Sequence, residues 1–179
     1  MLLCTGGCRS GKSEYARHWA EARGASRVYI ATAYVSSDPE MQQRIALHQQ
    51  SRKDGWRTLE AASSLWVKPR QLVREAADMG DVLLFDCLTL WTSLCVEHGR
   101  DEAATLELTS LLLESFQECG RPVVLVTNEV GMGLVPENAL ARSFRDMVGF
   151  VNQKAASFAD SVVFMVSGLP LVVKGDPNV

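Results

Sequence analysis

Several features that would define other protein classes are missing from this sequence. Its five cysteines form no Cys-x-x-Cys pair and are odd in number, so neither a disulfide framework nor a zinc site is indicated. No apolar run approaches the ~18 residues of a membrane-spanning helix. No basic leader or apolar signal segment precedes the first strand-like run. We therefore expect a cytoplasmic protein without a transmembrane segment.

The sequence also has no excess of basic residues over acidic ones. The net charge is −3, and charged residues make up 22% of the chain. A general nucleic-acid binder needs a basic face, so we expect no nucleic-acid partner. The 179 residues, 47% of them hydrophobic, suffice for one core, and no repeat, low-complexity segment or linker divides them. We expect a single domain over residues 1–179.

What the sequence does contain is a phosphate-binding pattern near its start. Residues 5–13 read Thr-Gly-Gly-Cys-Arg-Ser-Gly-Lys-Ser, which fits Gly-x-x-x-x-Gly-Lys-Ser between an apolar run and a helical turn. Glycines let the backbone wrap an anion closely, and the start of a helix attracts phosphate. Lys12 would reach the β- and γ-phosphates, and Ser13 would hold Mg²⁺. The predicted nucleotide-binding loop comprises Gly6, Gly7, Cys8, Arg9, Ser10, Gly11, Lys12 and Ser13.

Apolar runs that read as strands alternate with segments that read as helices. Near-continuous runs of Val, Leu and Ile are typical of parallel strands covered on both faces. The alternation predicts an α/β fold of the P-loop NTPase type, a mostly parallel sheet with helices on both faces. We expect strands at 2–5, 28–32, 82–86, 122–127 and 162–166. We expect helices from the loop to about residue 23, then at about 39–53, 64–78, 88–98, 102–118 and 136–159, and a frayed tail at 175–178.

Three polar residues follow buried strands at the end where ligands bind in such sheets. Asp86 closes the run 82–86 and could bind Mg²⁺ opposite Ser13. A strand-ending aspartate can also serve only as a cap. Asn128 and Glu129 follow the run 122–127 and lie where active-site groups are expected.

His48 lies between two arginines on one face of the helix expected at 39–53. Arg44 and Arg52 stand four residues before and after it. Arginine binds phosphate oxygens bidentately, and neutral imidazole can attack a nucleotide α-phosphorus. A solvated polar face is the simpler interpretation of the same spacing.

Four further residues have two interpretations each. Trp56 could stack on a base or fill a gap in the core, and Glu60 could bond a base edge or a ribose; for each alone, the structural role is favoured. Arg142 and Arg145 lie three residues apart and could meet phosphate or pair with nearby carboxylates.

Together these motifs resemble one family. The phosphate loop is followed by Arg44-Ile45-x-x-His48, by Trp56-Arg57-Thr58-x-Glu60, by a long block from Val126 to Asp146, and by Val166-Ser167-Gly168-Leu169-Pro170. This order resembles the bifunctional adenosylcobinamide kinase / adenosylcobinamide-phosphate guanylyltransferase family of cobalamin biosynthesis. The resemblance covers essentially the whole chain and is weakest over residues 62–121.

The resemblance implies two successive reactions and a set of site residues. ATP or GTP first phosphorylates adenosylcobinamide; GTP then guanylylates a histidine, and GMP passes to adenosylcobinamide phosphate to give adenosylcobinamide-GDP. The catalytic histidine of the family falls on His48, and the family forms trimers, so we expect a homotrimer. The position of Asp86 is often Glu in this family. Further nucleotide contacts that the resemblance implies are Ala31, Thr32, Ala33, Gln49, Gln50, Ser51, Arg52, Glu60 and Asp86, with Ser13 and Asp86 at the metal.

Two other functions remain compatible with a phosphate loop. A small-molecule kinase that lacks the transferase step would keep Lys12, Ser13 and Asp86 but would never modify His48. A non-catalytic, nucleotide-gated module would bind GTP without turnover.

Overall fold

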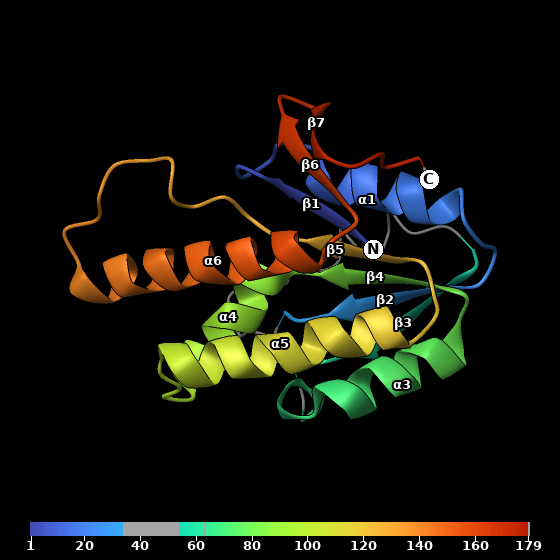
Figure 1. Ribbon diagram of the computed structural model, residues 1–179, viewed down its shortest axis with the longest axis horizontal. Helices are drawn as coiled ribbons and strands as arrows, with labels where there is room; N and C mark the ends of the chain where they lie inside the picture. The colour runs from blue at the N-terminus through green and yellow to red at the C-terminus, as the bar shows by residue number, and fades with distance from the viewer. Residues whose placement is uncertain (34–53, 63, 179) are drawn as a thin grey trace.

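The computed structural model describes residues 1–33, 54–62 and 64–178, and these contain one sheet of seven strands in the order β3-β2-β4-β5-β1-β6-β7 (Figure 1). All neighbouring strands are parallel except β6 and β7, which are antiparallel. The strands are β1 Leu2–Gly6, β2 Arg27–Ala31, β3 Trp56–Glu60, β4 Val82–Asp86, β5 Val123–Val126, β6 Ser161–Val166 and β7 Leu169–Lys174.

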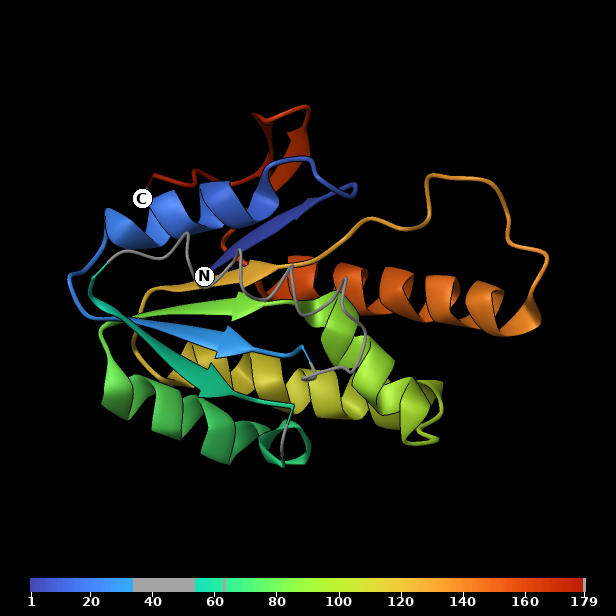
Figure 2. The ribbon, with the colours of Figure 1, turned by 180° about the vertical axis from the view of Figure 1, so that it is seen from behind.

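Helices cover both faces of this sheet (Figure 1, Figure 2), which confirms the predicted fold class. α1 lies on one face, and α3, α4, α5 and α6 lie on the other. The helix expected at 39–53 lies outside the described residues. The helices are α1 Lys12–Glu21, the short 3-10 turn η1 Leu65–Val67, α3 Pro69–Met79, α4 Leu88–Glu97, α5 Glu102–Glu118 and α6 Ala139–Phe158.

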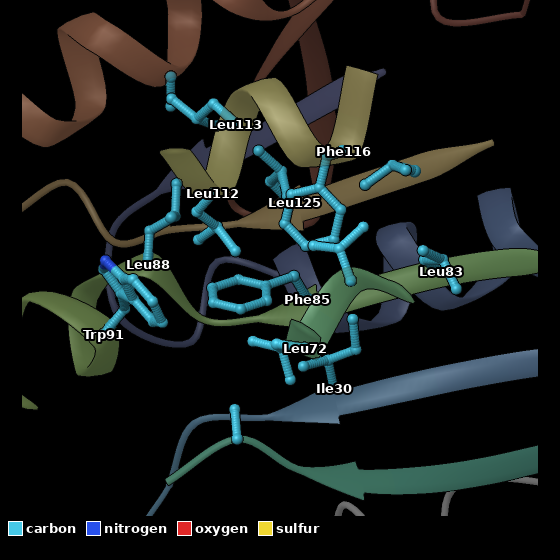
Figure 3. Packing of buried hydrophobic residues seen from close by; sticks show 14 of the residues in the cluster. Ile30, Leu72, Leu83, Phe85, Leu88, Trp91, Leu112, Leu113, Phe116 and Leu125 are labelled. Carbon is cyan, nitrogen blue, oxygen red and sulfur yellow. The ribbon is translucent and has the colours of Figure 1, made fainter. Parts of the chain in front are cut away.

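The face under α3–α6 carries an aromatic core centred on Phe85 (Figure 3). The Phe85 ring meets Trp91 and Phe116 edge-on, with ring centroids 5.9 and 5.6 Å apart. Such edge-to-face pairs add to the gain from burial alone. Ile30, Leu72 and other fully buried aliphatic side chains fill the space around these rings.

The face under α1 has smaller side chains. α1 buries Ala16 and Ala20, which lie one turn apart on its inner side, against a cluster that includes Leu2, Cys4 and Leu84. Cys4 is fully buried and acts as a small core residue, and burial raises the pKa of its thiol to about 12.

Two strands were not expected from the sequence. β3 is a strand at the edge of the described sheet with no fully buried residue, and its polar-rich sequence lacks the apolar run of the central strands. β7 is exposed along its whole length and begins Leu-Pro, a proline position that edge strands tolerate. The tight turn at Ser167 and Gly168, both with positive φ, reverses the chain between β6 and β7.

Two predicted helices begin later than expected. The segment 64–78 divides into η1 and α3 because Lys68 precedes Pro69 and is not helical, with φ −128° and ψ 63°. α6 starts at Ala139 instead of residue 136, since the Asn138 side chain accepts a hydrogen bond from the Ala141 N–H and caps the helix there.

The segment 175–178 is anchored, so the expectation of a frayed tail was wrong. Pro177 is buried, and its carbonyl accepts hydrogen bonds from the Trp19 indole at 2.7 Å and from Arg23 at 2.9 Å. The Arg23 guanidinium in turn lies 4.0 Å from the Trp19 ring centroid. The segment therefore docks on α1.

Candidate nucleotide-binding site

The phosphate loop joins β1 to α1 through unusual backbone conformations. Gly6, Arg9 and Gly11 have φ values of 148°, 55° and 96°. A Cβ on Gly6 would lie 2.5 Å from the carbonyl oxygen of Met165, so only glycine fits there. Gly11 is the N-cap of α1 and has no side chain, which leaves the first N–H groups of the helix available to an anion.

Lys12 is held inside this loop. The residue is 6% exposed, and its ammonium group donates to the carbonyl of Gly7 and, at 3.4 Å, to the hydroxyl of Ser10. Burial lowers the pKa of Lys12, while nearby thiols and Asp86 oppose that shift. The side chain is thus positioned within the loop that would bind phosphate. Cys8 and Arg9 are exposed at the tip of the loop.

Ser13 and Asp86 meet, as the sequence predicts. The Ser13 hydroxyl donates to Asp86 Oδ2 at 3.1 Å, from the first turn of α1 to the end of β4. The hydroxyl of Tyr29 on β2 donates to the same oxygen at 3.0 Å. Sequence reasoning missed Tyr29, because a tyrosine within a strand has no pattern that distinguishes it from ordinary packing.

Thr32 has a structural role beside Asp86. It is 1% exposed, and its hydroxyl accepts from the Cys87 N–H at 2.7 Å and donates to the Cys87 carbonyl at 3.0 Å. Its own N–H donates to the Asp86 carbonyl at 3.2 Å. The Thr32 side chain therefore fixes the turn after β4, and Ala33 follows it at the same edge of the sheet.

Three predicted nucleotide contacts lie in one row. The strand register pairs Glu60 of β3 with Ala31 of β2, and Ala31 with Asp86 of β4. Paired residues of parallel strands point to the same face, here the α1 face. Glu60 is thus on the same side of the sheet as Asp86 but two strands away. His48, Gln49, Gln50, Ser51 and Arg52 lie outside the described residues, so the structure does not test their roles.

Trp56 lies at the opposite end of the sheet from the phosphate loop, because it starts β3 and pairs with Arg27 at the start of β2. Its indole donates to Glu21 at 3.4 Å, and the Arg27 guanidinium lies 5.5 Å from its ring centroid. The structural interpretation of Trp56 agrees with this place, since its ring packs against the cluster under α1.

Two loops contact the phosphate loop through backbone hydrogen bonds. The Glu129 N–H donates to the Gly6 carbonyl at 2.9 Å, from the loop between β5 and α6. The Gly168 N–H, from the turn between β6 and β7, donates to the Ser10 carbonyl at 3.0 Å. Glu129 therefore lies beside the phosphate loop, as expected from its place after β5.

A network of side-chain hydrogen bonds holds the start of the β5–α6 loop. The Thr127 hydroxyl donates to Asn152 Oδ1 at 2.6 Å, and Asn152 Nδ2 donates to the Asn128 carbonyl at 3.0 Å. Thr89 joins the network, because its hydroxyl lies 3.3 Å from that of Thr127 and accepts from the Asn128 N–H at 2.8 Å. These bonds connect α4, β5 and α6, and no local sequence pattern predicts them.

The two arginines near the start of α6, Arg142 and Arg145, contact neighbouring groups of the protein. Arg142 donates to the carbonyls of Pro136 at 3.0 Å and Glu137 at 2.6 Å, just before the helix. Arg145 lies 3.9 Å from the carboxylate of Asp146. Arg145 therefore lies near a carboxylate, as the pairing interpretation expects. Arg142 binds backbone carbonyls instead, which neither interpretation predicts.

Neither a metal cluster nor a membrane span occurs in the described part of the chain. No three His, Cys, Asp or Glu side chains gather there as a metal ion would need. No helix there is long and apolar enough to cross a membrane.

Comparison with known proteins decides the family. The family model described as cobinamide kinase / cobinamide phosphate guanyltransferase matches residues 2–173. The chain belongs to this family. Two curated relatives agree. The bifunctional adenosylcobalamin biosynthesis protein CobU of Escherichia coli K12 is 41% identical over 188 residues, with 97% of this chain and 99% of the relative covered. Its counterpart CobP of Pseudomonas aeruginosa PAO1 is 40% identical over 178 residues, with 98% of each covered.

Among solved structures, the similarity concerns the fold alone. The KaiC-like protein PH0186 of Pyrococcus horikoshii OT3 superposes with a TM-score of 0.51 and is 14% identical. The match covers 91% of this cobinamide kinase family member and 69% of the archaeal chain. The family assignment therefore rests on the sequence matches, and the structure adds the arrangement of Lys12, Ser13 and Asp86.

Proposed function

We propose that this protein catalyses both reactions that its family name describes. It phosphorylates adenosylcobinamide with a nucleoside triphosphate, and it then transfers GMP from GTP to adenosylcobinamide phosphate. The observation that carries the proposal is the formed phosphate loop, with Lys12 inside it and Ser13 bonded to Asp86, in a chain of this family. We further propose that the enzyme acts in the cytoplasm as a homotrimer.

In the kinase reaction, this chain supplies positioning and charge. The N–H groups at the start of α1 and the Lys12 ammonium would bind the phosphates of ATP or GTP and offset the charge that develops as the γ-phosphoryl group moves. The hydroxyl of adenosylcobinamide would gain that group, and the nucleoside diphosphate would leave.

The residues present fit a magnesium ion. Mg²⁺ is bound through one or two protein oxygens together with water and phosphate oxygens, not by an all-protein cage. A hydroxyl and a carboxylate 3.1 Å apart at the end of the phosphate loop match that donor set. Ser13 and Asp86 would hold the ion, which when bound neutralises phosphate charge.

In the transferase reaction, His48 would be the nucleophile. A neutral imidazole nitrogen attacks the α-phosphorus of GTP, a P–N bond forms, and pyrophosphate leaves. The phosphate of adenosylcobinamide phosphate then attacks the same phosphorus, which gives adenosylcobinamide-GDP and frees His48. We assign Ala31, Thr32, Ala33, Gln49, Gln50, Ser51, Arg52 and Glu60 to nucleotide contacts of the two reactions.

The test is the mass of the intact protein after incubation with GTP and Mg²⁺ without corrinoid. We expect a single acid-labile GMP adduct that His48→Asn abolishes and that a control change at the exposed His18, His18→Asn, leaves in place. The His48→Asn variant should still phosphorylate adenosylcobinamide.

Other outcomes select the other functions. Bound GTP without an adduct, together with corrinoid phosphorylation, would leave a kinase that lacks the transferase step. GTP binding without any turnover would leave a nucleotide-gated module. Loss of both activities in a folded His48→Asn protein would make His48 a structural residue.

A further inference from the structure

Tyr29 on β2 contacts the Asp86 carboxylate from outside the phosphate loop and α1. Its hydroxyl donates to Asp86 Oδ2 at 3.0 Å, the oxygen that also accepts from Ser13 at 3.1 Å. The ring is half-buried and packs against the apolar cluster under α1. The side chain thus has a fixed apolar body and a polar end directed at the expected metal-binding carboxylate.

Strand register explains how this contact forms. Tyr29 pairs with Leu84, and Ala31 pairs with Asp86, so Tyr29 is a diagonal neighbour of Asp86 on the same face of the sheet. Diagonal neighbours on adjacent strands lie within reach of an aromatic side chain. Because both residues lie on central parallel strands, packing on both faces of the sheet holds the donor and the acceptor in place.

We propose that Tyr29 is a positioning residue for the cation site of the kinase. A carboxylate has about four acceptor positions, and its plane turns about a soft torsion. Two hydroxyl donors on Oδ2 fix that plane and leave the remaining lone pairs for a hydrated cation. Loss of a hydrogen bond that orients a ligating group typically lowers metal affinity or activity by about 10- to 100-fold. This inference rests on the assignment of Ser13 and Asp86 to the metal.

Tyr29→Phe isolates this role, because it removes the hydroxyl and keeps the ring. The protein offers a matched control in Tyr15→Phe. Tyr15 is also half-buried and packs against the same cluster, and within the described part of the chain its hydroxyl donates no hydrogen bond. Asp86→Asn serves as the reference for loss of the metal carboxylate.

The experiment is a Mn²⁺ titration of the full-length protein with a non-hydrolysable GTP analogue, followed by electron paramagnetic resonance. We expect Tyr29→Phe to weaken Mn²⁺ binding about tenfold. Tyr15→Phe should bind Mn²⁺ as tightly as wild type. In EDTA, wild type, Tyr29→Phe and Tyr15→Phe should bind the analogue with affinities within about twofold of one another. In the Asp86→Asn background, Tyr29→Phe should have no further effect on Mn²⁺ binding.

Three results would overturn the proposal. One is unchanged Mn²⁺ affinity in folded Tyr29→Phe protein. Another is an equal loss in EDTA or in Tyr15→Phe, which would make the effect one of packing. The third is a wild-type protein whose bound nucleotide recruits no Mn²⁺. Failure of the proposed function can be distinguished from failure of this inference. The Mn²⁺ titration measures metal binding even if the protein forms no GMP adduct or phosphorylates no corrinoid.

Discussion

The two faces of the sheet differ in what the same strands contribute to them. Phe85 of β4 points into the aromatic core under α3–α6 and is fully buried. Asp86, the next residue, points to the α1 face and meets Ser13 and Tyr29. On β2, Ile30 and Tyr29 divide in the same way. Successive side chains of a strand point to opposite faces of the sheet. Neighbouring residues of one strand therefore serve stability on one face and phosphate chemistry on the other.

This division indicates which substitutions should affect stability and which should affect activity. Large apolar side chains anchor the strands from one side, so the α1 face can hold a buried ammonium and a shared carboxylate without supplying most of the packing. The division predicts that substitutions of the polar site residues on the α1 face will reduce activity at little cost in stability, and that substitutions in the aromatic core on the other face will do the reverse.

The largest effect is expected from Lys12→Met. Loss of the ammonium should lower kcat/KM of the kinase reaction by ~10³-fold or more, since Lys12 is the buried cation of the loop and would offset phosphate charge directly. Urea unfolding should show unchanged or slightly raised stability, because burial already disfavours the charged Lys12 and lowers its pKa. Lys154→Met on α6 is the control and should leave both quantities near wild type. A folded Lys12→Met enzyme with a tenth of wild-type activity would contradict the assignment.

Phe85→Ala should have the opposite profile. Removal of a fully buried ring that contacts Trp91 and Phe116 should cost about 3–5 kcal/mol of unfolding free energy in urea titrations. The KM for nucleotide should be unchanged in the folded fraction. Phe85→Leu, which should cost about 1–2 kcal/mol, keeps the test open if the alanine variant does not fold. A KM that rises with either variant would mean that the two faces are coupled.

Asn152→Ala tests the border between the two faces. The network of Thr127, Asn128 and Asn152 lies on the α6 side but holds the loop whose Glu129 contacts Gly6. We expect a loss of about 1–2 kcal/mol in unfolding free energy, because the Thr127 hydroxyl loses its acceptor. The kinase kcat/KM should fall by about fivefold, a loss of about 1 kcal/mol. Gln153→Ala, at the next and exposed position, should change neither.

The sequence predicts the parts of this structure whose signal is local. Continuous apolar runs locate the central strands, and the spacing of Gly6, Gly11, Lys12 and Ser13 locates the phosphate loop. Asp86 is predictable because it ends such a run. β3 and β7 lack that signal, since edge strands need not be buried on both faces.

The rest of the site depends on register and could not be predicted locally. Tyr29 can reach the Asp86 carboxylate because the strand register pairs Ala31, two residues after Tyr29, with Asp86. Thr32 holds the Cys87 backbone, and Asn152 holds Asn128, across segments that are far apart in the sequence. Contacts of this kind follow from the order of strands, which no single segment encodes.

The position of β1 has a consequence for synthesis of the chain. β1 is made first, yet its partners in the sheet are β5 and β6, and the turn that donates to the Ser10 carbonyl follows β6. Residues 5–13 therefore leave the ribosome long before the strands that flank them. Even where early segments generally fold first during synthesis, a nascent chain that stops before β6 carries the phosphate-binding motif without its supports. Tight nucleotide binding is thus expected only after β6 and the turn that follows it have been made.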